Sequence, residues 1–319
     1  MTLTTLPDPA HERASATGAV YRFLRGIPTW VLWLLVMIWL IPTFGLFVSS
    51  FRGKDVQRNS GWWTVFTGNL DQLGLQNYKA VLNSTANGGM SLALANSLAI
   101  ALPATIIPIL IAAFAAYAFA WIEFPYRQLL FIATIALLAI PTQVSLIPLS
   151  LMFGKGAHYT VPFFDKTITV MPNLHLQGDT TAVWLTHTAF GMPFAIFLLH
   201  NYIASLPRDL FEAARIDGAD HFTIFWRLVL PLSVPVLAAF AIFQFLWTWN
   251  DYLVAVVMVG SNSRAWPATV NIAQQAGTFS DNEHLLTAGA FIQCVVPLCV
   301  FFLLQRFFVR GILAGSVKG

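Results

Sequence analysis

Six long apolar runs constrain this 319-residue chain more than any other feature. Each run is about as long as an α-helix that crosses the hydrocarbon core of a bilayer, which takes about 20 residues. Lipid offers no hydrogen-bond partner to the backbone, so a spanning run has to form a helix. The runs cover residues 29–50, 92–121, 128–153, 181–204, 233–259 and 285–305. The sequence therefore predicts an all-α, polytopic membrane protein with six transmembrane helices.

The composition agrees with a membrane protein and argues against two soluble domains. Hydrophobic residues make up 57% of the chain and charged residues 10%, whereas a soluble domain carries about 25% charged residues. The net charge of +3 is small and spread along the chain, so nucleic acid is not an expected partner. Cys294 and Cys299 lie five residues apart in one apolar run. That spacing favours neither a disulfide nor a metal site.

The polar segments between the runs face opposite sides of the membrane in turn. Six spans place both termini on one side, which carries ten of the 17 Lys and Arg residues. The positive-inside rule therefore favours cytoplasmic termini, although Arg52 and Lys54 beside the first span oppose it. Residues 1–28 lack a signal-peptide cleavage site and are expected to form a flexible cytoplasmic tail. A six-span transmembrane domain over 29–310 and a cytoplasmic tail over 311–319 complete the expected domains.

The segment between the fourth and fifth runs, residues 205–231, is rich in charge for a connection between spans. Its charged residues are Arg208, Asp209, Glu212, Arg215, Asp217, Asp220 and Arg227. The pattern predicts two short helices separated by Gly218, which supplies a bend and a C-cap. Ser205 is expected to be the N-cap of the first helix, with Pro207 in its first turn. One face of that helix carries apolar side chains, those of Leu210, Phe211 and Ala214.

This loop resembles the signature cytoplasmic loop of importer-type ABC permeases. The matching residues are Glu212-Ala213-Ala214, Gly218, Leu228 and Leu230-Pro231, and Leu228 departs mildly from the Ile that is more common there. The end of the chain, Gln305 to Gly319, resembles the C-terminus of maltose-type sugar permeases. Further matches are Asn96-Ser97, Ala116-Tyr117-Ala118-Phe119, Ile147-Pro148-Leu149 and Trp249-Asn250-Asp251. Over about residues 29–319 the chain is similar to the maltose-type carbohydrate ABC transporter permeases, the inner-membrane components of binding-protein-dependent importers.

The resemblance implies a type I ABC importer permease fold and a division of labour among subunits. A second, different permease forms a heterodimer with this chain, two ATPase subunits hold ATP and Mg²⁺, and an extracytoplasmic sugar-binding protein delivers the substrate. This subunit would bind no cofactor and no metal, and would not be an enzyme. Its Gly-Lys candidate, Gly154-Lys155-Gly156, lacks the other residues of a phosphate-binding loop. The resemblance also implies a bacterial plasma membrane location, contact with membrane lipid, and cytoplasmic termini.

The resemblance assigns ATPase coupling to the central loop, where a coupling helix docks into a cleft of the ATPase. The implied residues are Leu210, Phe211, Glu212, Ala213, Ala214, Asp217, Gly218, Leu230 and Pro231. Leu210 and Phe211 are expected to fill the cleft. The loop before the last span is expected to contact the binding protein through Ser261, Asn262, Ser263, Gly277 and Thr278. Lys318 in the C-terminal tail is expected to reach the ATPases.

The transported compound is expected to be a sugar, either an oligosaccharide or a glycoside such as an α-glucoside. A sugar site needs amides, hydroxyls and aromatic rings without strong charge. The spans offer such side chains at Asn96, Thr142, Gln143, Gln244, Trp247, Trp249, Asn250 and Gln293. For each of them, a polar residue satisfied at a helix interface is the commoner explanation. In the maltose-type pair, moreover, the partner subunit supplies most sugar contacts.

Two other classes of membrane protein compete with this interpretation. An ion-coupled secondary transporter needs carboxylates within the membrane. Asp251 is the clear candidate, while Glu123, Asp281 and Glu283 lie at span edges, and the inverted repeats of such transporters are not evident. A membrane-embedded enzyme needs a catalytic cluster, whereas the seven histidines are scattered. Uptake that depends on a partner ATPase distinguishes an ABC importer from an ion-coupled transporter. Copurification of an ATPase distinguishes it from a membrane-embedded enzyme.

Overall fold

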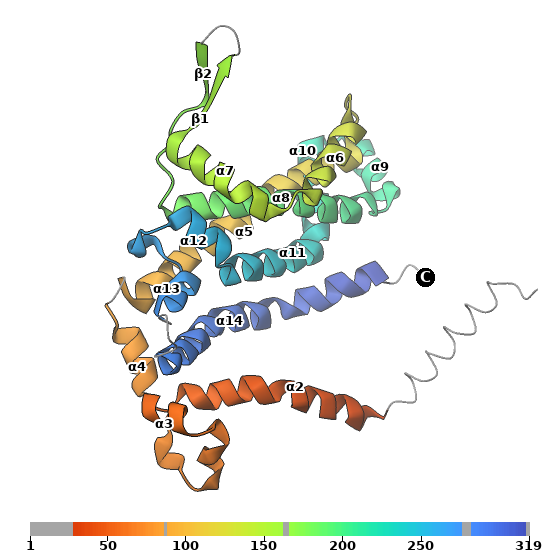
Figure 1. The fold of residues 1–319 in the computed structure, drawn as a ribbon. Helices are drawn as coiled ribbons and strands as arrows, with labels where there is room; N and C mark the ends of the chain where they lie inside the picture. The colour runs from red at the N-terminus through yellow and green to blue at the C-terminus, as the bar shows by residue number, and fades with distance from the viewer. Residues whose placement is uncertain (1–27, 86–87, 162–165, 276–281, 317–319) are drawn as a thin grey trace, which may run out of the picture. The chain divides into compact units, whose positions relative to one another are not determined.

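The computed structural model describes residues 28–85, 88–161, 166–275 and 282–316 (Figure 1). The described chain divides into two compact units, one ending at Gly74 and the other beginning at Leu75. The domain boundaries expected from the sequence stay a prediction, because this division does not address them. Apart from one β-hairpin, the regular structure in both units is helical.

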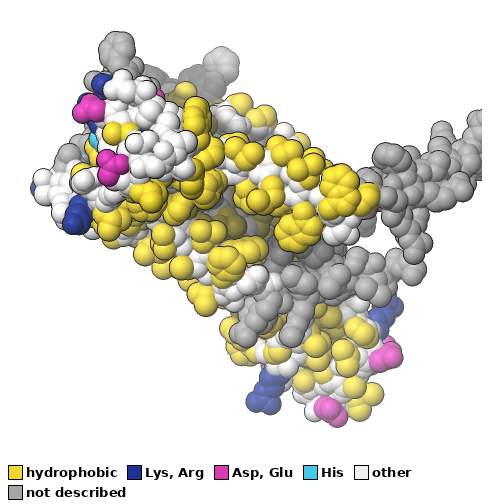
Figure 2. Space-filling view, turned by 90° about the horizontal axis from the view of Figure 1, so that it is seen from below, with side chains coloured by type: hydrophobic (Ala, Val, Ile, Leu, Met, Phe, Trp, Pro, Cys, Tyr) yellow, Lys and Arg dark blue, Asp and Glu magenta, His cyan; other side chains and the backbone are white. Residues whose placement is uncertain are grey.

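The predicted spans are confirmed as helices. Five helical segments are long and apolar enough to cross a membrane, and a bent pair of helices makes a sixth span when counted as one. The five are α2 (Thr29–Ser50), α5 (Gly89–Trp121), α8 (Thr180–Ala204), the continuous segment His221–Asn250, and Glu283–Gln305 of α14 (Glu283–Ser316). The apolar side chains of α2 are largely exposed, as expected for a surface that faces lipid, whereas α8 is the most buried of the five. Figure 2 shows one face on which apolar side chains predominate and charged side chains gather in small groups.

The first unit consists of α2 and a small cap that a buried arginine organises. The cap contains α3 (Lys54–Asn59), η1 (Trp62–Thr67) and η2 (Leu70–Gln72). Arg52 follows α2 and is 1% exposed. Its guanidinium donates to Oε1 of Gln72 at 3.2 Å and to the carbonyl oxygens of Ser60 and Val56 at 3.1 and 3.2 Å. Because Arg52 has this structural role, its charge beside the first span is not evidence for the orientation of that span in the membrane.

The third predicted span, residues 128–153, is broken rather than straight. Helix α6 (Arg127–Ala136) runs into the short turn η4 (Leu137–Ala139), and α7 (Thr142–Lys155) leaves it at 99°. Pro141 stands at the break, and the preceding residue Ile140 has the extended backbone that a following proline favours. Pro148 lies inside α7 and does not end it.

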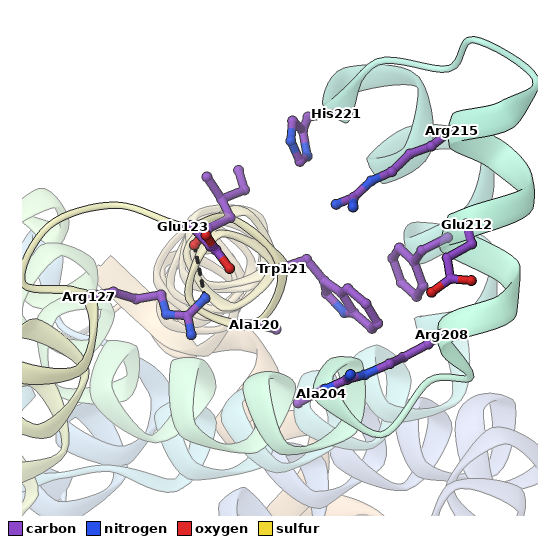
Figure 3. Close-up of a pocket in the computed structure, with 11 residues that line it drawn as sticks. Ala120, Trp121, Glu123, Arg127, Ala204, Arg208, Glu212, Arg215 and His221 are labelled. Atoms are coloured by element: carbon purple, nitrogen blue, oxygen red, sulfur yellow. Dashed lines mark hydrogen bonds between the residues drawn. The ribbon is translucent and has the colours of Figure 1, made fainter.

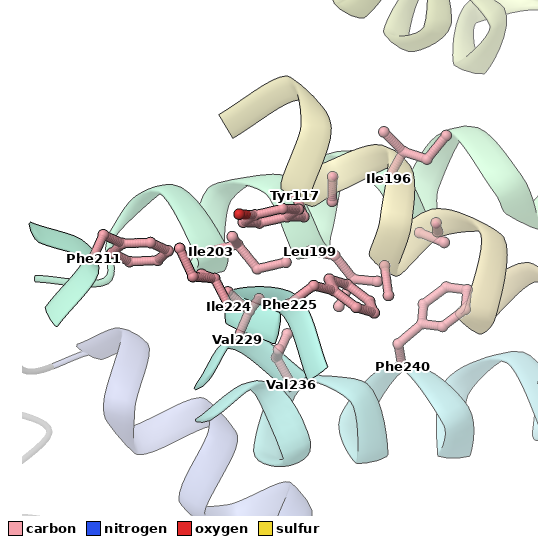
Figure 4. Packing of buried hydrophobic residues seen from close by; sticks show 14 residues of the cluster. Tyr117, Ile196, Leu199, Ile203, Phe211, Ile224, Phe225, Val229, Val236 and Phe240 are labelled. Carbon is pink, nitrogen blue, oxygen red and sulfur yellow. The ribbon is translucent and has the colours of Figure 1, made fainter. Parts of the chain in front are cut away.

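The second unit is built around α5 and α8, which make its most extensive helix contact, with α11 (Leu230–Asn250) against both. Small residues of α5 are fully buried at this contact, among them Ala112 and Ala116. They let two membrane helices approach closely. Figure 4 shows the cluster that joins these helices to the segment 205–231, from Phe240 through Leu199 and Phe225 to Phe211.

Several short elements complete the second unit. They are α4 (Gln76–Asn83), α9 (Arg208–Ile216), α10 (His221–Ile224), η5 (Phe225–Val229), α12 (Leu253–Val259), η6 (Ser263–Ala265) and α13 (Ala268–Gln275). The expected fifth span, 233–259, is wrong at both ends. It starts earlier, because α10 and η5 lead into α11 without a break. It ends at Asn250, because Asp251 is extended and its carboxylate accepts from the N–H of Ala255 at 3.1 Å in α12.

The polar loop expected at 154–180 contains a hairpin, which corrects the all-α expectation locally. Strands β1 (Ala157–Val161) and β2 (Lys166–Met171) pair antiparallel, with Tyr159 opposite Ile168 and Thr160 opposite Thr167. The two threonine hydroxyls lie 3.2 Å apart. Residues 167–170 are four consecutive β-branched residues in which threonine alternates with an apolar residue, a pattern that could have indicated a strand.

Candidate functional site

Particular residues determine where helix α9 begins and where it ends. Pro207, with an extended backbone, is its N-cap residue, while Ser205 is the C-cap of α8. The expected N-cap role of Ser205 is therefore wrong. At the other end, Gly218 donates to the carbonyl of Arg215 at 3.0 Å and Ala219 donates to that of Ala214 at 2.9 Å. This pair of hydrogen bonds is the Schellman motif, so the predicted bend and C-cap at Gly218 are confirmed.

The buried face of α9 packs against the C-terminal end of α5. Phe211 is 1% exposed. Its ring stacks on that of Trp121, with centroids 3.6 Å apart and planes 15° apart. The structure therefore corrects one expectation: the ring of Phe211 fills the core of this chain itself and is not free to fill a cleft of another subunit.

The segment from α9 to α10 also carries exposed apolar side chains, which we call together the coupling surface. Its residues are Leu210 at 40% exposure, Ile216 at 86% and Phe222 at 66%. The sequence analysis assigned neither Ile216 nor Phe222 to ATPase coupling, although both are apolar residues within a charged loop. Asp220 caps α10 by accepting from the N–H of Thr223 at 2.8 Å. The hydrogen bonds from Thr223 hold the pKa of Asp220 below its ordinary value.

The other residues of the sequence signature surround this surface. Glu212, Ala213 and Asp217 are exposed on α9, and Ala214 is half-buried. Leu230 and Pro231 begin α11 directly after η5, which is a π-helical turn. Such turns are rare in proteins, and those that occur are often found at functional sites.

An open cavity of about 770 Å³ lies between α9 and the α5–α6 turn. Figure 3 shows Arg208, Glu212 and Arg215 of α9 across the space from Glu123 and Arg127. Arg127 donates to the carbonyl of Ile122 at 3.1 Å. Within the described part of the chain, no ion pair joins the charged side chains that line it. Among these side chains, Arg127 is half-buried, and the exposed ones are Glu123, Arg208, Glu212 and Arg215.

The candidate sugar-contacting residues are dispersed and mostly engaged within the chain. Asn96 donates to the carbonyls of Arg264 and Trp266 at 2.8 and 3.1 Å, and so holds the loop before the last span. Thr142 and the exposed Gln143 begin α7. Asn250 donates to the carbonyl of Leu246, one turn back in its own helix.

The remaining candidates bind helices together. Trp249 is buried, stacks on Phe245, and donates to the carbonyl of Gln293 at 3.3 Å. Gln244 is fully buried and donates to the carbonyl of Ala104 on α5 at 3.1 Å and of His187 on α8 at 3.3 Å. These contacts match the helix-interface explanation, and a sugar contact stays untested for all eight residues.

A buried histidine and an aspartate form a pair that the sequence analysis did not identify. Nε2 of His187 lies 3.5 Å from Oδ2 of Asp251. The ring of Trp247 stands edge-on to His187 at 5.3 Å. Asp251 also organises the following segment, since its carbonyl accepts from Thr269 at 2.8 Å and its carboxylate accepts from Ala255. The carboxylate of Asp251 therefore stabilises the local structure at the break between α11 and α12.

The loop and tail predictions are only partly within the described residues. Ser261 and Asn262 are exposed, and Asn262 donates to the carbonyl of Gly178 at 2.7 Å. Ser263 starts η6. Gly277, Thr278 and Lys318 lie outside the described residues.

Comparisons with known proteins agree with this architecture. The family model described as "Binding-protein-dependent transport system inner membrane component" matches residues 109–314. The osmoprotective compounds uptake permease protein GgtD of Synechocystis is 48% identical over 96% of this chain and 97% of the relative. The alpha-glucoside transport system permease protein AglG of Rhizobium meliloti is 39% identical over 90% of this chain and 95% of the relative.

A solved structure shows the same fold. The crystal structure of a bacterial ABC transporter involved in the import of the acidic polysaccharide alginate aligns with a TM-score of 0.62 and 17% identity, covering 96% of this chain and 100% of that one. The family favours an ABC importer over an ion-coupled transporter. With the spans, the α9–α10 loop and these matches in agreement, the chain belongs to the family of binding-protein-dependent transport system inner membrane components.

Proposed function

We propose that this chain is one permease subunit of an ATP-driven importer that carries a glycoside of the α-glucoside class by alternating access. The α-glucoside permease relative supports the substrate class, because its similarity extends over almost its whole length. ATP and Mg²⁺ would be held by two separate ATPase subunits, and a second, different permease would complete the membrane pair.

The coupling surface is the observation that carries this proposal. Leu210, Ile216 and Phe222 expose apolar side chains on a charged loop between two spans. Apolar anchors of this kind fill pockets at protein interfaces, where a few residues supply most of the binding energy. We assign the ATPase as the subunit that covers them, with Glu212 and Asp217 at the rim. The loop and both termini would then be cytoplasmic.

Contacts on the opposite side would involve the binding protein. The hairpin and the α12–α14 connection lie at the other end of α8 from α9 (Figure 1). We assign the segment around Ser261 to Ser263, with Gly277 and Thr278, to binding-protein contact. Lys318 would reach the ATPases from the C-terminal tail.

The coupling assignment is tested by Ile216→Ser and Phe222→Ser in the assembled transporter. Each change removes an exposed anchor, so ATPase recovery with the permease and sugar uptake should both fall about tenfold or more. Glu212→Lys should act in the same direction. Tyr126→Asn is the matched control, because Tyr126 is an exposed aromatic at the α5–α6 turn with a positive φ that Asn tolerates. Wild-type ATPase recovery and uptake in both serine variants would reject the assignment.

The substrate class has its own test. Uptake of labelled methyl α-glucoside by cells that express the whole transporter should be competed by α-glucosides and not by methyl β-glucoside. The expected selectivity arises because hydrogen-bonding sites discriminate strongly against a hydroxyl or glycosidic oxygen in the wrong direction. Equal competition by the two anomers would contradict the α-glucoside assignment while leaving the ATPase coupling intact.

A further inference from the structure

Three aromatic side chains of α5 lie at the end of that helix that contacts the segment 205–231. Phe114, Tyr117 and Trp121 occupy positions i, i+3 and i+7, which place them on one face of a helix. We call them the aromatic ladder. Each member contacts a different part of the segment 205–231, although α5 and that segment are far apart in the sequence.

Trp121 holds α9. Its ring stacks on Phe211 at 3.6 Å, and its Nε1–H donates to the carbonyl of Ile203 at 3.1 Å. The indole therefore contacts both α9 and the end of α8, the helix that precedes α9 in the chain.

Tyr117 and Phe114 hold α10 and η5. The hydroxyl of Tyr117 lies 2.9 Å from Nδ1 of His221, the first residue of α10. The ring of Phe114 stacks on Phe225 at 4.3 Å and meets Trp226 edge-on at 6.0 Å. Phe225 opens the π-helical turn, so the ladder reaches the point where the loop becomes α11.

We propose that the aromatic ladder carries the movement of the coupling surface into α5. This inference rests on the proposed function. The loop is joined covalently to α8 and α11, and the ladder adds α5 as a third helix that must move with it. Trp121 and Tyr117 are thus positioning residues: neither belongs to the coupling surface, and they act by keeping the loop and α5 in one body. Because α5 packs along most of α8, its displacement extends through the bundle.

The test uses Trp121→Ala in the complete transporter with its binding protein. ATPase copurification should stay at the wild-type level, because the coupling surface is untouched. The stimulation of ATP hydrolysis by sugar-loaded binding protein, and the sugar imported per ATP, should each fall about tenfold, as for a lost coupling of ordinary size. Trp121→Phe keeps a ring against Phe211 and should restore most of the coupling. Phe119→Ala is the matched control, since Phe119 lies on the same helix but contacts Phe124 and Phe131.

Tyr117→Phe keeps the packed ring and removes the hydroxyl, so it serves if Trp121→Ala fails to insert. It should lower sugar imported per ATP without changing ATPase recovery. Unchanged stimulation and stoichiometry in Trp121→Ala, or in Tyr117→Phe where the first variant does not assemble, would overturn the ladder. An equal loss in Phe119→Ala would also overturn it, because the effect would then be general packing. Failure of the wild-type permease to recover any ATPase would instead overturn the proposed function.

Discussion

At the residue scale, Gly218 decides where α9 ends. Its φ of +80° lies in the left-handed region, and a Cβ placed there would meet open space. Glycine is therefore required here by its backbone conformation and not by a lack of space. An ordinary side chain in this conformation costs about 1–2 kcal/mol, whereas Asn tolerates it.

We therefore predict that Gly218→Val and Gly218→Asn differ sharply. Val should disrupt the Schellman motif, displace Ile216, and lower both ATPase recovery and uptake. Asn should retain most of both activities, since it can keep the positive φ. Copurification of the ATPase and uptake in the same cells measure the effect. Equal loss in the two variants would show that something other than backbone conformation requires glycine.

At the element scale, the buried amide of Gln244 joins three helices. Its Nε2 donates to carbonyls on α5 and α8. Gly191 of α8 gives it room, because a Cβ at that position would lie 2.6 Å from Oε1 of Gln244. The close packing of α8 against α11 thus depends on a small residue opposite a polar one.

A double-mutant cycle can measure this dependence. Gly191→Ala alone should destabilise the permease by about 1–3 kcal/mol, the usual cost of overpacking. In a Gln244→Ala background the clashing atoms are gone, so adding Gly191→Ala should cost almost nothing. Reversible unfolding in mixed micelles gives the four free energies. Additive effects would show that the two residues are independent.

The sequence predicted elements whose signal is local and missed those set by distant contacts. The span α2 was predicted with its observed bounds because apolar length is a property of the run itself. The C-cap at Gly218 followed from a single residue type. In contrast, the burial of Phe211 depends on Trp121, ninety positions away, and the pairing of His187 with Asp251 depends on how α8 meets α11. The break after Asn250 had a local signal in the polar pair Asn250-Asp251, which the apolar run over residues 253–259 outweighed.

At the scale of the whole molecule, α8 fixes which loops face opposite sides of the membrane. With 25 residues it is about 37 Å long at 1.5 Å per residue, enough to cross the hydrocarbon core. The hairpin precedes its first residue and α9 follows its last. The hairpin and the coupling surface must therefore lie in different compartments, whatever the orientation of the chain.

Cysteine labelling can determine that orientation. Val170 on β2 and Ile216 at the end of α9 are both highly exposed, so a cysteine at either position should react readily. The native Cys294 and Cys299 are first replaced by Ala, because both are exposed. In spheroplasts, a membrane-impermeant maleimide should label Val170→Cys and spare Ile216→Cys, and inside-out vesicles should reverse the pattern. The impermeant reagent cannot cross the bilayer, so each result reports one side. Labelling of Ile216→Cys in sealed spheroplasts would invert the topology and place the coupling surface out of reach of any cytoplasmic ATPase.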